Sequence, residues 1–301
     1  MKPIHEPRIC DYEGSDYRER FWEHADRAYE DQAERLALRH LLPSQGRRLV
    51  EIGAGFGRLL GEYRQFDEVF LLDYAPSMIA DAHARLAGSR PGLRFVCADL
   101  YKLPFADAAL DTVVQVRVLH HVEAVEKAVA EVARVLRAGA SYVLEYANKR
   151  NLKALLRYGL GRQEANPLDP SSHEFVPLNW NHHPTRVAAA LKGAGLAPVS
   201  QRTVSLFRHP ALKARLSAER LATLDDLLAG PLAGLQLGPS QFLRALRLQG
   251  GRLNPQVWRC PTCGYEGLEE QGDALPCPGC GRRWPIVDGV YHFRQDLLDQ
   301  G

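Results

Sequence analysis

The sequence has no long hydrophobic run and little cysteine outside one C-terminal segment. None of its apolar stretches approaches the ~20 residues that a membrane-spanning helix needs, and residues 1–6 lack the apolar character of a secretion signal. Of six cysteines, only Cys10 and Cys97 lie outside that segment, too few and too far apart for a disulfide framework. We therefore expect a protein of the reducing cytoplasm, with no membrane span.

A strong net charge is also missing, but the charges are unevenly distributed. The formal net charge is +2, with 46% hydrophobic and 25% charged residues, as in ordinary globular proteins. Residues 148–259 hold 16 of the 38 Lys and Arg residues and only 6 of the 36 Asp and Glu residues. This basic stretch fits a surface for phosphates or an anionic substrate, and it equally fits the solvated faces of helices.

Short apolar runs alternate with helical periodicity through the first half of the chain. This alternation predicts a mainly parallel α/β sheet covered by helices on both faces. Strands are expected at 48–52, 68–73, 93–98, 110–118 and 141–146, and helices at 16–42, 76–86 and 122–136, with Gly139 as the last helix's C-terminal stop. In the helix at 16–42, the apolar face is expected at Phe21, Ala25, Tyr29, Leu36 and His40. Further on, a polar insertion at 148–184 precedes a helix at 184–195, a strand at 199–207, a helical stretch at 210–230 and an edge strand at 241–248.

A glycine-rich turn follows the first predicted strand. Glu51 is followed at alternate positions by Gly53, Gly55 and Gly57. Glycine lets the backbone pass close to a ligand and adopt positive φ without a steric penalty. A dinucleotide site of the form G-x-G-x-x-G would need glycine where the chain has Arg58. The turn predicts a ligand at the carboxyl edge of the sheet, without the dinucleotide pattern.

Carboxylates end the second and third predicted strands. Asp73 can accept hydrogen bonds from both hydroxyls of a ribose, a role that would serve NAD as well. Asp99 can accept a bond from an adenine amino group. Each acid alone is also compatible with a helix cap or a turn, but the ordered series of strand ends favours a nucleoside cofactor.

The pattern from Glu51 to Gly57 resembles the E/D-x-G-x-G-x-G signature of class I S-adenosylmethionine-dependent methyltransferases. Residues 72–78 and 98–105 resemble the family's second and third motifs, and residues 118–122 and 134–139 resemble the branch containing quinone-biosynthesis methyltransferases. The resemblance implies a Rossmann-like methyltransferase domain over residues 46–250 that binds S-adenosylmethionine. It places the glycines at the methionine part, Asp73 at the ribose, and Tyr74, Met78, Asp99 and Leu100 around the adenine. The implied cofactor contacts are Glu51, Gly53, Ala54, Gly55, Gly57, Asp73, Tyr74, Met78, Asp99, Leu100, Val116 and Arg117.

The C-terminal cysteines form two C-x-x-C pairs, Cys260 with Cys263 and Cys277 with Cys280, separated by 13 residues. This spacing is typical of a tetrahedral thiolate zinc site, although unrelated thiols or a disulfide pair are the alternatives. Four thiolates leave no open coordination position, so we expect a structural zinc.

Residues 258–290 resemble the zinc-binding activator subunit of RNA- and protein-modifying methyltransferases, through the cysteines and through the Pro-Ile-Val-Asp-Gly sequence at 285–289. In that family a separate subunit pairs its strand with the catalytic domain. The resemblance implies a zinc ribbon at 256–301 on the same chain, as a brace for the fold or as a docking surface.

Methyl transfer requires the acceptor to be held in line with the methyl–sulfur bond, and sometimes a proton to be removed. The candidates for proton handling are His120 and His121 after the fourth predicted strand, and Tyr12 and Tyr17 on a helical lid predicted at 1–45. Packing or capping roles are the alternatives. We expect a small, apolar-to-amphipathic acceptor; the alternative is an RNA or a translation protein docked through the zinc module.

Overall fold

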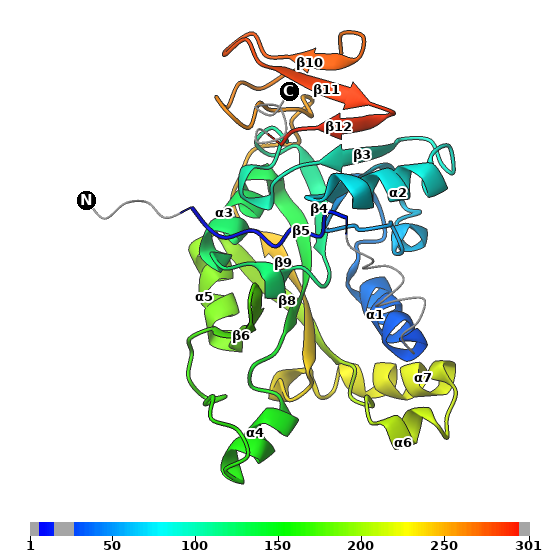
Figure 1. The fold of residues 1–301 in the computed structure, drawn as a ribbon, viewed down its shortest axis with the longest axis vertical. Coiled ribbons are helices and arrows are strands. Elements are labelled where there is room, and N and C mark those ends of the chain that lie inside the picture. Colours follow the sequence, from blue (N-terminus) through cyan, green and yellow to red (C-terminus); the bar gives the residue numbers. More distant parts are fainter. Residues whose placement is uncertain (1–5, 15–26, 295–301) are drawn as a thin grey trace, which may run out of the picture.

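The computed structural model describes residues 6–14 and 27–294, and a ten-stranded mixed sheet crosses most of that part of the chain (Figure 1). The strand order is β10-β11-β12-β3-β2-β1-β4-β5-β9-β8. The five strands from β3 to β5 are parallel, and β9 runs antiparallel to both of its neighbours. The strands are β1 (Gly46–Ile52), β2 (Phe66–Asp73), β3 (Leu93–Cys97), β4 (Leu110–Gln115), β5 (Leu136–Ala147), β8 (Leu196–Val204), β9 (Ser240–Arg247), β10 (Ala274–Pro276), β11 (Arg283–Val287) and β12 (Val290–His292).

Helices cover both faces of the sheet, as the alternation predicted. One apolar core lies between the sheet and helices α3 and α5, and a second lies between the sheet and helices α1, α2 and α7. These two sets lie on opposite sides of the strands (Figure 1). The helices are α1 (Ala28–Leu41), α2 (Pro76–Leu86), α3 (Val125–Val135), α4 (Leu152–Gly159), α5 (Pro184–Gly193), α6 (Pro210–Lys213) and α7 (Ala218–Ala229), with short 3₁₀ turns at Leu60–Glu62, Leu100–Lys102, Leu119–His121 and Ala233–Leu235. None of the described helices has both the length and the apolar character to cross a membrane.

The buried face of α1 differs from the predicted one. Ala33, Ala37 and Leu41 are buried at steps of four residues, whereas Leu36 is only partly buried and His40 is exposed. The prediction is confirmed for Tyr29, which is buried, and wrong for Leu36 and His40, because the buried stripe continues from Tyr29 in steps of four residues and leaves those two positions on its flank. Residues 16–26 of the predicted helix lie outside the described residues. The described segment at 6–14, part of the region predicted as a helical lid, has no regular secondary structure.

The predicted end of one strand and the predicted stop of one helix are wrong because of local backbone geometry. Strand β4 stops at Gln115, before Arg117, whose φ is 59°. Helix α3 stops at Val135, so Gly139 does not end it; Gly139 has a φ of 73° and lies in an irregular part of β5, where the pairing with β4 shifts register.

The last part of the predicted catalytic domain also differs in detail. Strand β8 begins three residues earlier than predicted and ends before Ser205, whose φ is 66°. The predicted helical stretch at 210–230 is two helices, because Ser217 caps the start of α7. The strand predicted at the edge, β9, lies between β5 and β8, so β8 is the edge strand.

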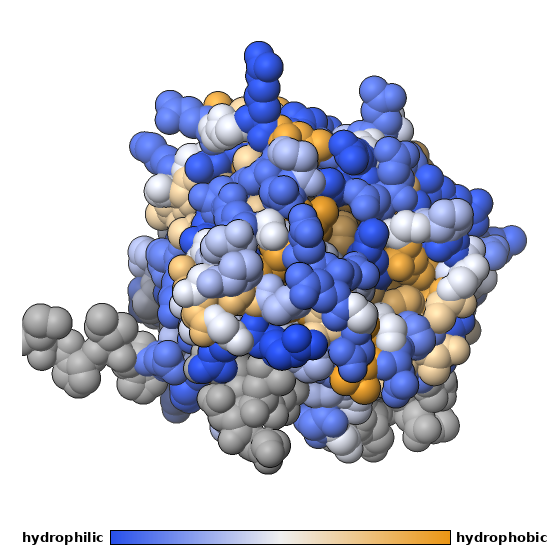
Figure 2. Space-filling view, turned by 90° about the horizontal axis from the view of Figure 1, so that it is seen from above, coloured by the Kyte–Doolittle hydropathy of each residue, from blue (hydrophilic) through white to orange (hydrophobic). Residues whose placement is uncertain are grey.

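The C-terminal module, residues 256–294, continues the catalytic sheet. Strand β12 pairs in parallel with β3, with Val290 opposite Phe95 and His292 opposite Cys97. The Trp258 ring stacks on Phe105 with ring centroids 5.5 Å apart, and it belongs to the same apolar core as α3. The module therefore shares the core of the catalytic part. Its outer face, which is seen from above in Figure 2, is largely hydrophilic.

The insertion at 148–184 contains regular structure that the sequence did not predict. It contains α4 and a hairpin of β6 (His173–Val176) and β7 (Asn179–Asn181). A bridge between Asn148 and His182 closes the insertion at its base, next to the carboxyl end of β5. The hairpin thereby returns to the edge of the sheet where the predicted cofactor residues lie.

Candidate functional site

The glycine turn lies at the carboxyl end of β1 and has the backbone geometry that only glycine accommodates without strain. Gly53 has a φ of 70°, and a Cβ atom there would lie 2.1 Å from Cγ2 of Val118. Gly57 has a φ of 74°, and its Cβ atom would lie 2.4 Å from Cδ1 of Leu86. Gly53 therefore keeps the turn close to the loop after β4, whereas Gly57 lets the turn pack on α2.

Asp73 connects the glycine turn to the end of β2. Its carboxylate accepts hydrogen bonds from the backbone N–H groups of Gly55, at 2.8 Å, and Ala75, at 3.1 Å. Burial raises the pKa of Asp73, and these backbone bonds oppose the shift. Asp99 accepts a bond from the N–H of Tyr101 at 2.8 Å, and burial raises its pKa too. Both carboxylates are held by backbone donors at the predicted edge of the sheet.

A cavity of about 120 Å³ lies at this edge. It is lined by ten of the residues predicted from the sequence and by further residues of the N-terminal segment, of the strand ends and of the loop after β4. The predicted residues in its wall are Tyr12, Gly53, Gly55, Asp73, Tyr74, Met78, Asp99, Leu100, Arg117 and His121. The others are Arg8, Ile9, Cys10, Ile52, Leu72, Ala98, Tyr101, Val118 and Val122. The sequence thus identified the wall formed by the glycine turn and the strand ends, and it missed the part of the wall formed by residues 8–10.

A second, smaller cavity of about 40 Å³ shares Gly53, Gly55 and Arg117 with the first. Its remaining wall consists of Glu51, Ala54, Phe56, Arg58 and Val116. Oε2 of Glu51 is buried and has no hydrogen-bond partner in the described part of the chain. Burial raises the pKa of Glu51 to about 8, against the attraction of Arg58. A buried carboxylate oxygen with spare hydrogen-bonding capacity suits a cationic ammonium group, so this cavity fits the amino-acid end of S-adenosylmethionine.

A buried ionic cluster supports this second cavity, and the sequence did not predict it. Glu34 of α1 forms salt bridges with Arg58 after the glycine turn and with Arg117 after β4. Burial opposes ionisation of Glu34, but the two guanidinium groups outweigh it and lower its pKa. Arg117 also donates its backbone N–H to Glu145 at 3.0 Å. An acidic residue between Ala33 and Ala37, inside the buried stripe of α1, was the available signal in the sequence.

The two histidines after β4 differ in what they contact. Nδ1 of His121 lies 3.0 Å from the carbonyl oxygen of Leu178, and Nε2 lies 3.0 Å from the hydroxyl of Tyr12. Because a carbonyl only accepts, Nδ1 carries the proton in the neutral ring and Nε2 accepts from Tyr12. Burial lowers the pKa of His121, which favours this neutral form. His120 lines neither cavity, although its ring centroid lies 4.0 Å from that of His121.

The segment at 6–14 covers the larger cavity and is attached at several points. Arg8 forms salt bridges with Glu123, after β4, and with Glu174 of the β6–β7 hairpin. Asp11 pairs with Arg294 of the C-terminal module at 3.3 Å. Tyr12 thus lies in the cavity wall, while Tyr17, the other predicted tyrosine, lies outside the described residues.

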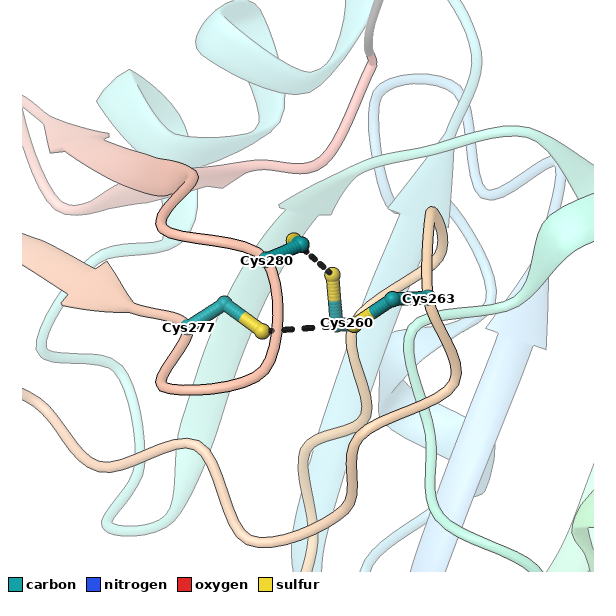
Figure 3. A group of neighbouring side chains, drawn as sticks. All are labelled: Cys260, Cys263, Cys277 and Cys280. Carbon is teal, nitrogen blue, oxygen red and sulfur yellow. Dashed lines mark hydrogen bonds between the residues drawn. The ribbon is translucent and has the colours of Figure 1, made fainter.

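The four cysteines of the C-terminal module point toward one another from two loops (Figure 3). Their sulfur atoms all lie within 4.8 Å of one another, with Cys260 and Cys280 3.7 Å apart and Cys263 and Cys277 3.5 Å apart. A tetrahedron with zinc–sulfur bonds of about 2.3 Å has sulfur–sulfur edges of about 3.8 Å, and a disulfide bond is only about 2.05 Å long. The geometry therefore fits four zinc ligands and does not fit disulfide pairs.

Comparisons with known proteins agree with this site. A family model described as a methyltransferase domain matches residues 50–144. A demethylmenaquinone methyltransferase of Roseiflexus is 31% identical over 179 residues, which cover 54% of this chain and 73% of the relative. A ubiquinone/menaquinone biosynthesis C-methyltransferase of Stutzerimonas stutzeri is 29% identical over 178 residues, 53% of this chain and 69% of the relative.

Among solved structures, a chain from the complex between the Haloferax volcanii Trm112 methyltransferase activator and a methyltransferase is similar to this chain. The superposition has a TM-score of 0.52 at 18% identity and covers 77% of this chain and 93% of the other. At this identity, the similarity concerns the fold alone.

Proposed function

The chain belongs to the class I S-adenosylmethionine-dependent methyltransferases, and on this premise we propose that it methylates a small, largely apolar acceptor. The observation that carries the proposal is the enclosure of the larger cavity by Ile9, Tyr12, Val118 and Val122, beside the predicted cofactor residues. A wall of this kind suits a small apolar molecule better than a polymer. The names of two relatives, a ubiquinone/menaquinone biosynthesis C-methyltransferase and a demethylmenaquinone methyltransferase, support an acceptor of this class.

Each end of the cofactor has suitable groups in the two cavities. Asp73 would accept from the ribose hydroxyls, and Asp99 and Leu100 would border the adenine between Tyr74 and Met78. The predicted contacts that line the smaller cavity would surround the methionine part, whereas Gly57 lines neither cavity. Glu51 would hold the amino group of that part, because its free carboxylate oxygen faces the smaller cavity. Arg117, held by Glu34 and Glu145, would fix the loop beneath the methionine.

S-adenosylmethionine supplies a methyl group on a sulfonium sulfur, which keeps the bonding electron pair and leaves as a neutral thioether. The protein must hold the acceptor in line and exclude water. If the acceptor loses a proton, Nε2 of His121 would take it directly or through the hydroxyl of Tyr12, since this nitrogen is unprotonated in the neutral ring. His120 stays a candidate from the sequence, although it lines neither cavity. Tyr17 also stays a candidate and lies outside the described residues.

Zinc would hold the two loops of the C-terminal module together through Cys260, Cys263, Cys277 and Cys280, without taking part in the reaction. The module would then act as a brace, because β12 and Trp258 are built into the catalytic sheet and core. Residues 256–294 contain four arginines and five carboxylates, which does not favour RNA docking by the module itself. The proposed units remain an N-terminal lid at 1–45, a catalytic domain at 46–250 and the zinc ribbon at 256–301.

A second candidate function is methylation of an RNA or a translation protein. It is supported by the basic stretch at 148–259 and by the parallel pairing of β12 with β3, a pairing between activator and catalytic parts that the sequence resemblance also implies. In this case the C-terminal module would present a docking surface as well as a brace.

Transfer of labelled methyl groups into a host-cell lysate separates the two candidates. The purified protein is incubated with methyl-labelled S-adenosylmethionine and lysate, which is then fractionated into organic extract, RNA and protein. We expect label in the organic extract for the wild type and none for Asp73→Ala, whose binding of S-adenosylmethionine is checked by calorimetry. Label in RNA or protein would contradict the small acceptor and support the second candidate function. Unimpaired cofactor binding by Asp73→Ala would contradict the proposed cofactor site.

A further inference from the structure

Helix α4 has its apolar stripe directed away from the protein. Leu152 and Leu156 are 49% and 58% exposed, and Leu160, which follows the helix, is 66% exposed. The buried residue of this helix is the small Ala154. The helix is nevertheless firmly placed, because Asn151 caps it and the N–H of Leu152 donates to the carbonyl of Leu237 at 2.8 Å. A contiguous stripe of exposed leucines is typical of a surface that binds a partner.

Basic side chains accompany this stripe. Arg150, Lys153, Arg157 and Arg162 lie on or beside α4, and the salt bridges among the described residues include none of them. A cleft of about 330 Å³ between α4 and the β6–β7 hairpin is lined by Lys149, Lys153 and Arg157, together with Phe175, which is 51% exposed. The surface thus combines free positive charge with exposed apolar groups.

More exposed leucines lie at the same end of the molecule. Helix α7 exposes Leu224, Leu227 and Leu228, and the loop that follows exposes Leu235. In Figure 1, α4, α6 and α7 all lie at the end opposite the C-terminal module. The view from above that module, by contrast, is mostly hydrophilic (Figure 2).

This surface is connected to the candidate active site. Helix α4 follows the carboxyl end of β5, the same edge of the sheet that carries the glycine turn and the two histidines. The β6–β7 hairpin, which forms the other wall of the basic cleft, provides the carbonyl of Leu178 that accepts from His121. A molecule that binds across α4 and the hairpin is therefore in contact with elements that border the site.

We propose that α4 and the β6–β7 hairpin form a docking surface for an anionic phospholipid bilayer. Leucines would enter the boundary between headgroups and acyl chains, while the lysine and arginines beside them would contact anionic headgroups. Charge complementarity favours this partner. The exposed apolar side chains beside the basic residues are mainly leucines, which cannot stack on bases, and the exposed aromatic ones are Tyr158 and Phe175. The proposal goes beyond the proposed reaction and does not depend on it, because membrane binding is measured without methyl transfer.

Co-sedimentation of the purified full chain with lipid vesicles tests the proposal. We expect binding to vesicles of phosphatidylcholine mixed with phosphatidylglycerol, weaker binding to phosphatidylcholine alone, and a loss of binding at high salt. The variant Leu156→Gln/Leu160→Gln should weaken binding by about tenfold or more, because each leucine loses its burial in the bilayer. Lys153→Gln/Arg157→Gln should weaken it on anionic vesicles alone.

The matched control is Leu248→Gln/Val287→Gln, which removes two similarly exposed apolar side chains from other parts of the surface. It should bind vesicles like the wild type. Failure of the wild type to bind anionic vesicles overturns the proposal, and so does equal loss of binding in the control.

Two further results would also overturn it and would name another partner. One is tight binding to bulk tRNA that Lys153→Gln/Arg157→Gln abolishes and the leucine variant leaves intact. The other is a dimer in sedimentation velocity that the leucine variant dissociates, which would make this surface an interface between copies of the chain.

Discussion

The catalytic sheet carries two additions, the C-terminal module and the insertion at 148–184, which differ in whether their apolar side chains are buried or exposed. The C-terminal module buries Trp258, Trp284 and Phe293 in the main core and adds its strands beyond β3. The insertion at 148–184 joins at the carboxyl end of β5 and leaves Leu156 and Phe175 in solvent. Apolar area removed from water stabilises the fold, whereas exposed apolar area is available to a partner. The comparison indicates a brace at one end and a recognition surface at the other.

Removing the proposed zinc from the C-terminal module should have the largest effect on stability. Without it, the two cysteine loops lose their connection and β12 loses its support beside β3, which we expect to cost about 5 kcal/mol or more of the free energy of unfolding. Cys260→Ser/Cys277→Ser should do the same. Metal analysis, thermal unfolding and amide exchange at β3 measure the effect, and an unchanged Tm after verified metal loss would contradict the role of a brace.

Trp258→Ala should have the next largest effect. The ring contacts Phe105, Tyr291 and Phe293 in the shared core, so its loss leaves a cavity and costs about 3–5 kcal/mol. Urea unfolding gives the free energy, and Trp258→Phe serves as the milder control. A loss below about 1 kcal/mol would mean that the module folds apart from the catalytic core.

Glu51→Gln tests the site that lies between the two additions. The folded pKa of about 8 exceeds the ordinary value of 4.5, so the stability that Glu51 contributes at low pH is lost as the pH rises from about 4.5 to 8. The neutral variant should avoid this loss and be more stable than the cofactor-free wild type above pH 8, by about 1–3 kcal/mol. It should also bind S-adenosylmethionine more weakly. Thermal unfolding across this pH range, with calorimetry, would reveal a failure of either expectation.

The variant Arg294→Gln tests whether the C-terminal module also supports the cofactor site. The guanidinium lies 3.7 Å from the centroid of the Tyr74 ring and donates to the Tyr74 carbonyl at 2.9 Å, while pairing with Asp11. Its loss should weaken binding of S-adenosylmethionine by about tenfold, with a cost of about 1–2 kcal/mol. Arg283→Gln, at an exposed position of the same module, is the control for calorimetry. Equal affinities in both variants would limit the module to a role in folding.

Leu156→Gln/Leu160→Gln should change stability least. Because both side chains are already exposed, the free energy of unfolding should stay within about 0.5 kcal/mol of the wild type. Chemical denaturation in the absence of lipid measures it. A loss of more than about 2 kcal/mol would show that these leucines support the fold and would remove the contrast between the two additions.

Much of the catalytic core could be predicted because its signals are local. The strand runs, the glycine turn and the C-x-x-C pairs each depend on neighbours within a few residues. Ten of the predicted site residues, Asp73 and Asp99 among them, line one cavity at the carboxyl edge of the sheet. The errors occurred where distant parts meet. The burial of Glu34 between two arginines, the position of β9 inside the sheet and the structure of the insertion could not be read from short-range patterns.

The sequence by itself determined the fold class, the cofactor chemistry and the grouping of four thiols that could hold a metal, because backbone conformation at glycine and ligand type at cysteine are properties of the residues themselves. Only the tertiary structure decided which residues of 8–12 close the cavity, that Tyr12 meets His121, and that α4 directs its leucines outward. These outcomes depend on which surfaces the whole chain can bury at once. A stripe of leucines has the same spacing whether it faces a core or solvent, so its direction is set by packing alone.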